Sequence, residues 1–406
     1  FELRDFHIVR GGAELLSMDR ASLSASWVGR DLWIAHLSAE LPQTGPLLAS
    51  GRAQMSADHV DISGFSIQGP GQLSASGRFG LDRVASDLNL QWQGLRWPLT
   101  ATGDALVVSG ANGGAHMTGV LDDYQLSLQS DAQVRKLPVR LTVHGNGSRQ
   151  ELKIADLSLS ADKGALHAQG MLGWSPELSA DLQMQIAHLN PALFAAGWSG
   201  ELNGTAAAHT VPHAGGPEAI FSARLDRSTL RGYPLTLAVD GTAGASSVQF
   251  QQLLLRSGKG SLDASGMVAW APALRADLQA KISNFDPGPF VPLVSGSSAQ
   301  DAATRWSGVI NGTVSAQTTM RADKPAIAFA IKVDQSRLRG YPLALAAQGE
   351  LHGETLNLRA FTLTSGDTRL STSGQATPPF DLTGKLDSPD LAALVPGFAG
   401  RGDSDS

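Results

Sequence analysis

The 406-residue sequence contains no cysteine, and this absence excludes several kinds of chemistry. Without a thiol the chain cannot form disulfides, use a thiolate nucleophile or hold zinc through sulfur ligands. Aromatic residues are also scarce, at 6%, which is little for several large globular cores. Charged residues make up 17% and the net charge is −6, so no basic surplus indicates nucleic-acid binding.

Long apolar runs are missing as well. The longest, such as Ala326–Ile331, fall far short of the ~20 residues that a membrane-spanning helix needs. No basic segment followed by an apolar one opens the chain, so no signal peptide is predicted. Because the sequence begins with Phe1 and ends abruptly, we expect it to be an interior part of a longer protein, with any membrane anchor outside it.

What the sequence does contain is an alternation of apolar and polar residues. It covers Leu178–Ile186, Leu274–Ile282, Leu137–Val143, Ile327–Val333 and Phe380–Leu386. Successive side chains of a strand point to opposite faces, so each segment predicts a strand with one apolar and one polar face. That arrangement is typical of antiparallel sheets, and we predict an all-β chain.

The chain also repeats itself at long intervals. Arg227–Leu235 recurs as Gln335–Leu343, 108 residues later, and Gly164–Gly170 recurs as Gly260–Gly266, 96 residues later. A polar insert at Val294–Gln300 absorbs the difference. Such repetition predicts an array of similar units rather than unrelated domains. We predict one continuous, elongated β-repeat region over residues 1–406, with approximate units 40–135, 136–231, 232–339 and 340–406.

Glycines recur inside the predicted strands. Gly170, Gly266 and Gly374 occupy matching positions, and Gly77 belongs to an earlier copy. Glycine within a strand marks bulges and bends, so we expect these residues to curl the sheet. The apolar face of a curled antiparallel sheet would line a hydrophobic groove. An open groove of that length is an aggregation liability unless something fills it.

The order of these motifs resembles a known family. Runs of the form Leu-x-Leu-x-x-Leu-x-Leu precede a Gly-x-Leu-x-x-x-Gly kink, an Asn-Pro or Asp-Pro turn, a Trp-Ser-Gly-x-Leu/Ile-Asn-Gly-Thr segment and then Leu-Arg-Gly-Tyr-Pro-Leu. This order resembles the TamB family, the inner-membrane subunits of the bacterial translocation and assembly module, within the wider AsmA-like, bridge-type group of lipid-transfer proteins. The segment Leu386–Arg401 resembles that family's boundary between repeats.

The resemblance implies a folded-over β-sheet, or β-taco, whose groove spans the periplasm in a protein anchored in the inner membrane. It implies that phospholipid moves along the groove between the inner and outer membranes, and that the protein supports outer-membrane protein assembly. The implied partners are phospholipid, the outer-membrane subunit TamA through a region outside this sequence, and outer-membrane protein clients. We expect no cofactor, no metal and no catalytic residue.

Candidate groove residues are the apolar positions of the alternating segments. They are Leu137, Leu141, Val143, Leu178, Leu182, Met184, Ile186, Leu274, Leu278, Ile282, Phe329, Ile331 and Val333. Each buried CH₂ of an acyl chain contributes ~0.8 kcal/mol, so such a surface would hold lipid without specific contacts. The alternative is that these side chains pack against each other in a closed core.

Other motifs have simpler explanations. His209 and His213 are four residues apart, but Pro212 and Gly215 argue against the helix that would make them a metal site. Asp122 and Asp123 are adjacent, and we interpret them as a turn.

Local sequence signals predict several turns. Asn146, Asn203 and Asn311 each precede Gly, and we predict hairpin turns there. Short helical turns are expected after Asn190 and at Leu391–Leu394. Arg231 and Arg339 precede Gly-Tyr-Pro turns, where they could meet lipid phosphates or discourage pairing at a sheet edge.

Three classes of function follow. The first is a lipid conduit, and the second is a scaffold or chaperone that pairs with strands of outer-membrane proteins or autotransporters by β-augmentation without carrying lipid. The third is a β-helical polysaccharide-active enzyme or adhesin. Parallel β-helices show shorter rungs with Asn or Gly at their corners, and their enzymes add a carboxylate cluster. Neither pattern is visible, so the third class is the least favoured.

Overall fold

The structure is a computed structural model that describes residues 2–10, 13–41, 45–98, 107–175, 177–211, 216–291, 306–321, 324–389 and 402–405. These residues form β-strands and two short 3-10 helices. The chain divides into two compact units, residues 1–196 and residues 197–406. The predicted helical turn at Leu391–Leu394 and the insert Val294–Gln300 lie outside the described residues.

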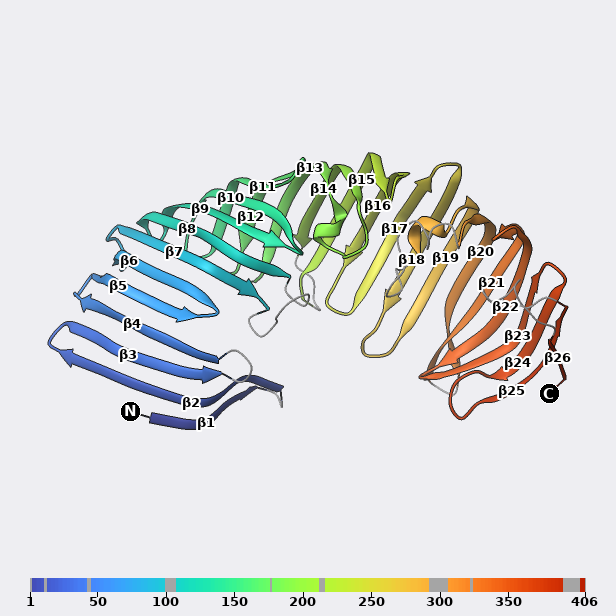
Figure 1. The fold of residues 1–406 in the computed structure, drawn as a ribbon, viewed down its shortest axis with the longest axis horizontal. Helices are drawn as coiled ribbons and strands as arrows, with labels where there is room; N and C mark the ends of the chain where they lie inside the picture. The colour runs from blue at the N-terminus through green and yellow to red at the C-terminus, as the bar shows by residue number, and fades with distance from the viewer. Residues whose placement is uncertain are drawn as a thin grey trace. The chain divides into compact units, whose positions relative to one another are not determined.

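In the first unit each strand pairs antiparallel with the strand before it in the chain, as Figure 1 shows. The strands are β1 (Glu2–Arg10), β2 (Ala13–Val28), β3 (Asp31–Leu41), β4 (Gly45–Met55), β5 (His59–Gly69), β6 (Gly71–Gly80), β7 (Ser86–Trp97), β8 (Val108–Val120), β9 (Asp123–Val134), β10 (Leu137–Gly147), β11 (Glu151–Ala161), β12 (Gly164–Gly173) and β13 (Ser179–Leu189).

The second unit follows the same rule of pairing between neighbours in the chain. Its strands are β14 (Gly200–Val211), β15 (Glu218–Leu230), β16 (Tyr233–Ala243), β17 (Ser247–Ser257), β18 (Gly260–Ala269), β19 (Arg275–Phe285), β20 (Gly308–Arg321), β21 (Lys324–Leu338), β22 (Tyr341–His352), β23 (Thr355–Ser365), β24 (Thr368–Gln375), β25 (Asp381–Ser388) and β26 (Gly402–Asp405).

The prediction of an all-β chain built on antiparallel sheet is confirmed. Among the described pairings no strand closes back onto the first strand of its unit, so neither sheet is a barrel. The parallel β-helix alternative is wrong, because every described pairing is antiparallel.

The sequence repeat corresponds to six strands. The strands that begin at Leu137, Tyr233 and Tyr341 are β10, β16 and β22. The predicted unit limits at 136, 232 and 340 therefore fall in the turns before these strands. The division into compact units lies elsewhere, between β13 and β14, so the limits of the repeats stay a prediction.

The recurring glycines do lie inside strands and do bend them. Gly77, Gly170, Gly266 and Gly374 sit in β6, β12, β18 and β24 with φ of 122°, 144°, 134° and 118°. In each case a Cβ would overlap a carbonyl oxygen of the following strand, as that of Gly266 would overlap the oxygen of Asp277. Each glycine also faces a bulge in the preceding strand. Only glycine fits both the conformation and the space.

The bulge explains the spacing of the Leu-x-Leu-x-x-Leu-x-Leu runs. In β17, Phe250 pairs with Gly266 while Leu253 pairs with Ala264, so two residues are skipped between them. Without this bulge Phe250 and Leu253, an odd number of positions apart, would point to opposite faces. The bulge keeps both on one face and adds local twist.

The prediction of hairpin turns at Asn203 and Asn311 is wrong. Both residues lie inside strands, β14 and β20. The Asn311 N–H donates to Ser336 Oγ at 2.8 Å, and its Nδ2 donates to the Gln335 carbonyl at 3.0 Å. Ser336 is only 6% exposed. Asn203 makes the same contacts one repeat earlier, so these Asn residues fix a bulge in the adjacent strand rather than a turn.

Other local predictions are confirmed. A 3-10 helix, η2 (Pro191–Leu193), follows Asn190, whose side chain accepts the Ala192 N–H at 3.0 Å. Its repeat counterpart is η3 (Gly288–Phe290). Asp122 lies in the turn between β8 and β9, as expected, and Asp123 begins β9. The turn predicted at Asn146 is displaced: Asn146 lies inside β10 and pairs with Lys153, and the turn follows it, where the Ser148 N–H donates to the Glu151 carbonyl at 2.8 Å.

Replacing a kink glycine should destabilise its unit strongly. We expect Gly266→Ala to lower the free energy of unfolding by about 2 kcal/mol or more, because it adds both backbone strain and a steric overlap. Thermal unfolding followed by circular dichroism measures the effect. Ser265→Ala, at an exposed neighbouring position, is the control and should change stability by less than ~0.5 kcal/mol. Equal stability of the two variants would contradict the role assigned to the glycine.

Candidate functional site

The cross-strand register gathers the apolar residues of the first unit on one face. In an antiparallel sheet, directly paired residues share a face, so a row of pairs can be followed from strand to strand. One such row crosses nine strands, β5 to β13, without a polar side chain. It consists of Phe65, Ala75, Leu90, Ala115, Leu128, Val143, Leu157, Ala168 and Met184.

The second unit contains an equivalent row that begins at β14. It consists of Ala206, Ala223, Val239, Leu253, Ala264, Ala280, Val314, Ile331, Ala347 and Phe361, and continues to Thr372 and Gly384. We call the face that carries these rows the apolar face of each unit. At β24 and β25 this row changes to a hydroxyl and a glycine, while a neighbouring row on the same face, Leu363, Leu370 and Leu386, stays aliphatic.

Aromatic rings fill the gaps that glycines leave on the apolar face. Phe221 pairs with Gly241, and Phe329 pairs with Gly349; in both pairs a Cβ on the glycine would collide with the ring. Phe221 and Phe250 lie on strands two apart, and their rings meet edge to face with centroids 6.2 Å apart. The rings therefore link strands that are not neighbours and hold the local curvature of the sheet.

Most candidate residues lie within strands and on the apolar face. Leu137, Leu141 and Val143 are in β10; Leu182, Met184 and Ile186 are in β13; Leu278 and Ile282 are in β19; Phe329, Ile331 and Val333 are in β21. The structure brings β19 and β21 residues into common rows, for example Ile282 and Val333 on either side of Gly312.

Two candidates lie just outside the strands. Leu178 and Leu274 directly precede β13 and β19, and they are 71% and 44% exposed. Val143 is buried, whereas Leu182, Met184 and Ile186 are only half-buried. The polar neighbours Gln183 and Gln185, on the opposite face, are exposed. In the described part of the chain the apolar face is thus shielded by adjacent side chains, but it is not sealed into a closed core.

Sequence reasoning missed many members of the same face. Leu128, Leu157, Leu253 and Leu345 belong to it but lie on strands whose alternation is interrupted or short. The signal was present in the Leu-x-Leu-x-x-Leu-x-Leu runs. Once the two central positions are assigned to a bulge, both pairs of leucines fall on one face.

Comparison with known protein families identifies the chain. The family described as "TamB, N-terminal domain" matches residues 64–232 and again residues 221–405. The chain belongs to the TamB family. That family is a lipid-transport and outer-membrane assembly module associated with TamA and lipids, rather than a family of enzymes, and it indicates a periplasmic setting with an inner-membrane anchor. No curated protein and no solved structure matches the chain.

A half-buried arginine, Arg231, ties together one edge of the second unit of this TamB-family chain. Arg231 Nε donates to the Gly197 carbonyl at 2.9 Å, and Nη1 donates to the carbonyls of Pro289 and Val291 at 3.1 and 2.6 Å. Its guanidinium lies 4.7 Å from the centre of the Trp198 ring. Burial lowers the pKa of Arg231 from its ordinary value. Because these contacts are internal, the prediction that Arg231 meets lipid phosphates or guards an edge is wrong.

The ionisable groups of the polar face form surface pairs. Arg78 Nε donates to Asp61 at 2.8 Å, and this hydrogen bond holds the pKa of Asp61 below its usual value. His59 bonds Asp58 at 2.7 Å and lowers the pKa of that carboxyl in the same way. Such exposed pairs contribute little to stability.

The described residues carry neither a cluster of metal-binding side chains nor a helix that could span a membrane. They contain no group of three or more His, Asp or Glu placed to hold a metal ion. His209 lies in β14 and His213 lies outside them. No helix among them has the length and apolar character to cross a membrane.

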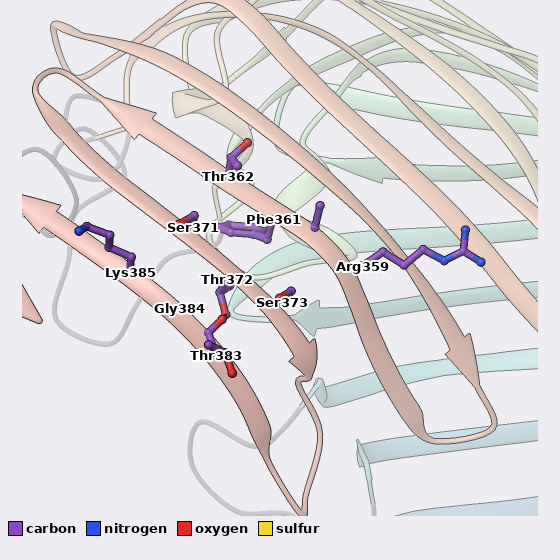
Figure 2. Close-up of a pocket in the computed structure, with 10 residues that line it drawn as sticks. Arg359, Phe361, Thr362, Ser371, Thr372, Ser373, Thr383, Gly384 and Lys385 are labelled. Carbon is purple, nitrogen blue, oxygen red and sulfur yellow. The ribbon is translucent and has the colours of Figure 1, made fainter. Parts of the chain in front are cut away.

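A cavity of about 670 Å³ lies over β23, β24 and β25. Its lining is rich in hydroxyl groups, from Thr362, Ser371, Ser373 and Thr383. Figure 2 shows Arg359 and Lys385 extending away from each other on either side of these hydroxyls. Arg359 pairs with Glu350. The lining also includes Phe361, Thr372 and Gly384, the last three members of the second unit's apolar row, so the cavity combines hydroxyl groups with the end of the apolar face.

Removing the Arg231 side-chain contacts should loosen the second unit. We expect Arg231→Met to lower the free energy of unfolding by about 2 kcal/mol, since several carbonyls lose their hydrogen-bond donor while the aliphatic stem is kept. Arg256→Met, at an exposed arginine of β17, is the matched control. Chemical denaturation of both variants measures the difference. If Arg231→Met lost no more stability than the control, the Arg231 side-chain contacts would make no contribution to the stability of the second unit.

Proposed function

We propose that the apolar face of this chain carries phospholipid acyl chains between the inner and outer membranes and supports outer-membrane protein assembly. The observation that supports the proposal most directly is the unbroken apolar row. The row from Phe65 to Met184 takes one residue from each of nine successive strands; all nine side chains are apolar, and most are half-buried. A surface of this kind needs a covering, and acyl chains provide one.

The chemistry of the two faces suggests how a lipid would be oriented. Acyl chains lie against the aliphatic rows of the apolar face, where each buried CH₂ contributes ~0.8 kcal/mol. The headgroup stays in water beyond the rim of the groove, because the rows themselves offer no charged side chain. The contact is therefore non-specific for the headgroup and specific for the acyl chain.

Uniform rows favour movement along the sheet. Adjacent strands present similar small and medium aliphatic groups, so neighbouring positions for a lipid have similar free energies. A lipid can then slide from strand to strand without one deep minimum to escape from. The direction of net transport must be set outside these rows.

The setting proposed for this activity is the periplasm, with an inner-membrane anchor and with TamA as the outer-membrane partner. Outer-membrane proteins are the proposed clients of the assembly role. The residues proposed to contact lipid are the candidates that lie on the apolar face, together with Leu178 and Leu274, which directly precede β13 and β19.

Native mass spectrometry of the 406-residue chain, purified from bacteria without detergent, tests the proposal directly. We expect co-purified phospholipid at more than one molecule per chain. A monodisperse chain free of lipid would contradict lipid carriage and would favour the client-strand scaffold instead.

A pair of substitutions on opposite faces of one strand locates the lipid. Leu182→Asp puts a carboxylate in an apolar row, whereas Gln183→Asp puts the same group on the exposed face. We expect lipid retention to weaken about tenfold in the first, because desolvating the carboxylate costs more than ~1.4 kcal/mol, and to be unchanged in the second. Lipid content is measured after both variants show the circular dichroism of a folded β-sheet. Equal lipid content would count against a groove site at Leu182.

A further inference from the structure

The polar face of the first unit contains two adjoining cavities. One, of about 260 Å³, lies over β7 to β10. Its polar lining residues are Asn89, Gln91, His116, Ser127, Gln129, Thr142 and His144, and Leu90, Gly114, Ala115 and Leu128 complete the lining. The other, of about 350 Å³, lies over β6 to β8 and is lined by Gln72, Ser74, Gln91, Trp92, Gln93, Asn112 and Gly113. Gln91 borders both, so they form one continuous surface on the side opposite the apolar face.

The cavities exist because β8 has no side chain at its centre. Gly114 pairs with Gln91 on one side and with Gln129 on the other. A Cβ added at Gly114 would lie 3.0 Å from the Leu90 carbonyl oxygen and 3.7 Å from the Gln91 Cγ. The glycine therefore leaves a trough between two glutamines, and a larger side chain would fill it.

The lining is rich in hydrogen-bonding groups, and its ionisable side chains are the two histidines His116 and His144. None of its residues is Lys, Arg, Asp or Glu. The carboxylates nearby are paired: Asp87 with the lining residue His116 at 2.8 Å, and Asp131 with Arg140 at 2.7 Å. The carboxamides of Gln91 and Gln129 are exposed and have no hydrogen-bond partner in the described part of the chain.

The same chemistry continues along the polar face. A register row opposite the apolar one consists of Ser74, Gln91, Gly114, Gln129, Thr142, Ser158, His167 and Gln185. A linear ligand lying across the strands would meet such a group about every 4.8 Å, the spacing of neighbouring strands, except at Gly114. Ordered repetition of this kind suits a polymer of polar units.

The equivalent row of the second unit has a different composition, so a neutral, hydrogen-bonding polar row is not a general property of the fold. An offset of 96 residues places Ser158, His167 and Gln185 at Leu254, Asp263 and Lys281. That row also contains Arg224, Ala238 and Lys332. Charged and apolar side chains replace the neutral hydrogen-bonding groups, so a neutral ligand is favoured only by the first unit.

We propose that the polar face over β6 to β10 binds a linear neutral glycan whose sugars carry hydroxyl and acetamido groups. Carboxamides both donate and accept, which matches acetamido groups reciprocally, while Ser, Thr and His side chains match hydroxyls. The neutral lining gives no counter-charge for a nucleic acid or an anionic headgroup. Since the backbone groups of these strands are already paired, a peptide could not add to the sheet here. The glycan and the acyl chains would occupy opposite faces, so this site is independent of lipid carriage.

Isothermal titration of the 406-residue chain with chitohexaose tests the proposal, with cellohexaose as the sugar that lacks acetamido groups. We expect saturable binding of chitohexaose and weaker binding of cellohexaose. Gly114→Leu, which fills the trough, should weaken chitohexaose binding at least tenfold. The double variant Gln91→Ala with Gln129→Ala should do the same without adding bulk, which covers the case in which Gly114→Leu fails to fold.

The controls separate this site from the lipid site. Gln279→Ala, an exposed glutamine of β19 in the second unit, and Leu182→Asp should both bind chitohexaose like the parent chain. Absence of saturable chitohexaose binding, or unchanged binding in the Gln91/Gln129 variant, would overturn the proposal. Equal affinity for cellohexaose would overturn the assignment of acetamido groups to the ligand. Displacement of chitohexaose by a Gly/Ser peptide of similar length would overturn the glycan proposal and identify a peptide as the ligand.

Discussion

The register between neighbouring strands is the constraint on which the rest of the structure depends. A slip of one residue would turn the whole apolar set of a strand to the opposite face. The chain prevents this with bulges that face kink glycines at six-strand intervals, as at Gly170 and Gly266. Buried serines such as Ser336, bonded to an asparagine of the preceding strand, hold further bulges in place. Local backbone irregularity thus preserves long-range regularity of the face.

A single-layer sheet changes how stability and binding are related. Most domains bury the apolar side of a sheet under a second layer of strands or helices. In each unit described here, the strands make pairings with chain neighbours and leave most of the apolar face half-buried. Anything that covers this face in the folded state alone adds its binding free energy to the stability of the sheet. Under the proposed function, lipid is therefore both cargo and a contributor to folding stability.

The strands with clean alternation could be predicted from the sequence, and β10, β13, β19 and β21 lie where the alternation placed them. The kink glycines could also be predicted, because the same residue recurs at one position of every repeat. The predictions that failed depended on partners distant in the chain. The Asn-Gly pair at Asn203 is typical of a turn, but in the structure the Asn203 N–H donates to the Ser228 hydroxyl, 25 residues away, and Asn203 lies in a strand. The sequence does not reveal the partners of Arg231, because the carbonyls of Pro289 and Val291 that accept its hydrogen bonds lie 58 and 60 residues further along the chain. The neutral polar row was equally invisible, since it exists only after registers are known.

Pairing between chain neighbours also has a consequence for how the molecule reaches its folded state. Every described pairing within a unit joins strands that follow each other directly, so each new strand needs only the one before it as a template. Loop closure costs little when partners are this close in sequence, and folding is correspondingly fast. Such a chain can acquire structure progressively from its first strand, while later segments are still emerging from the ribosome or from a translocation channel.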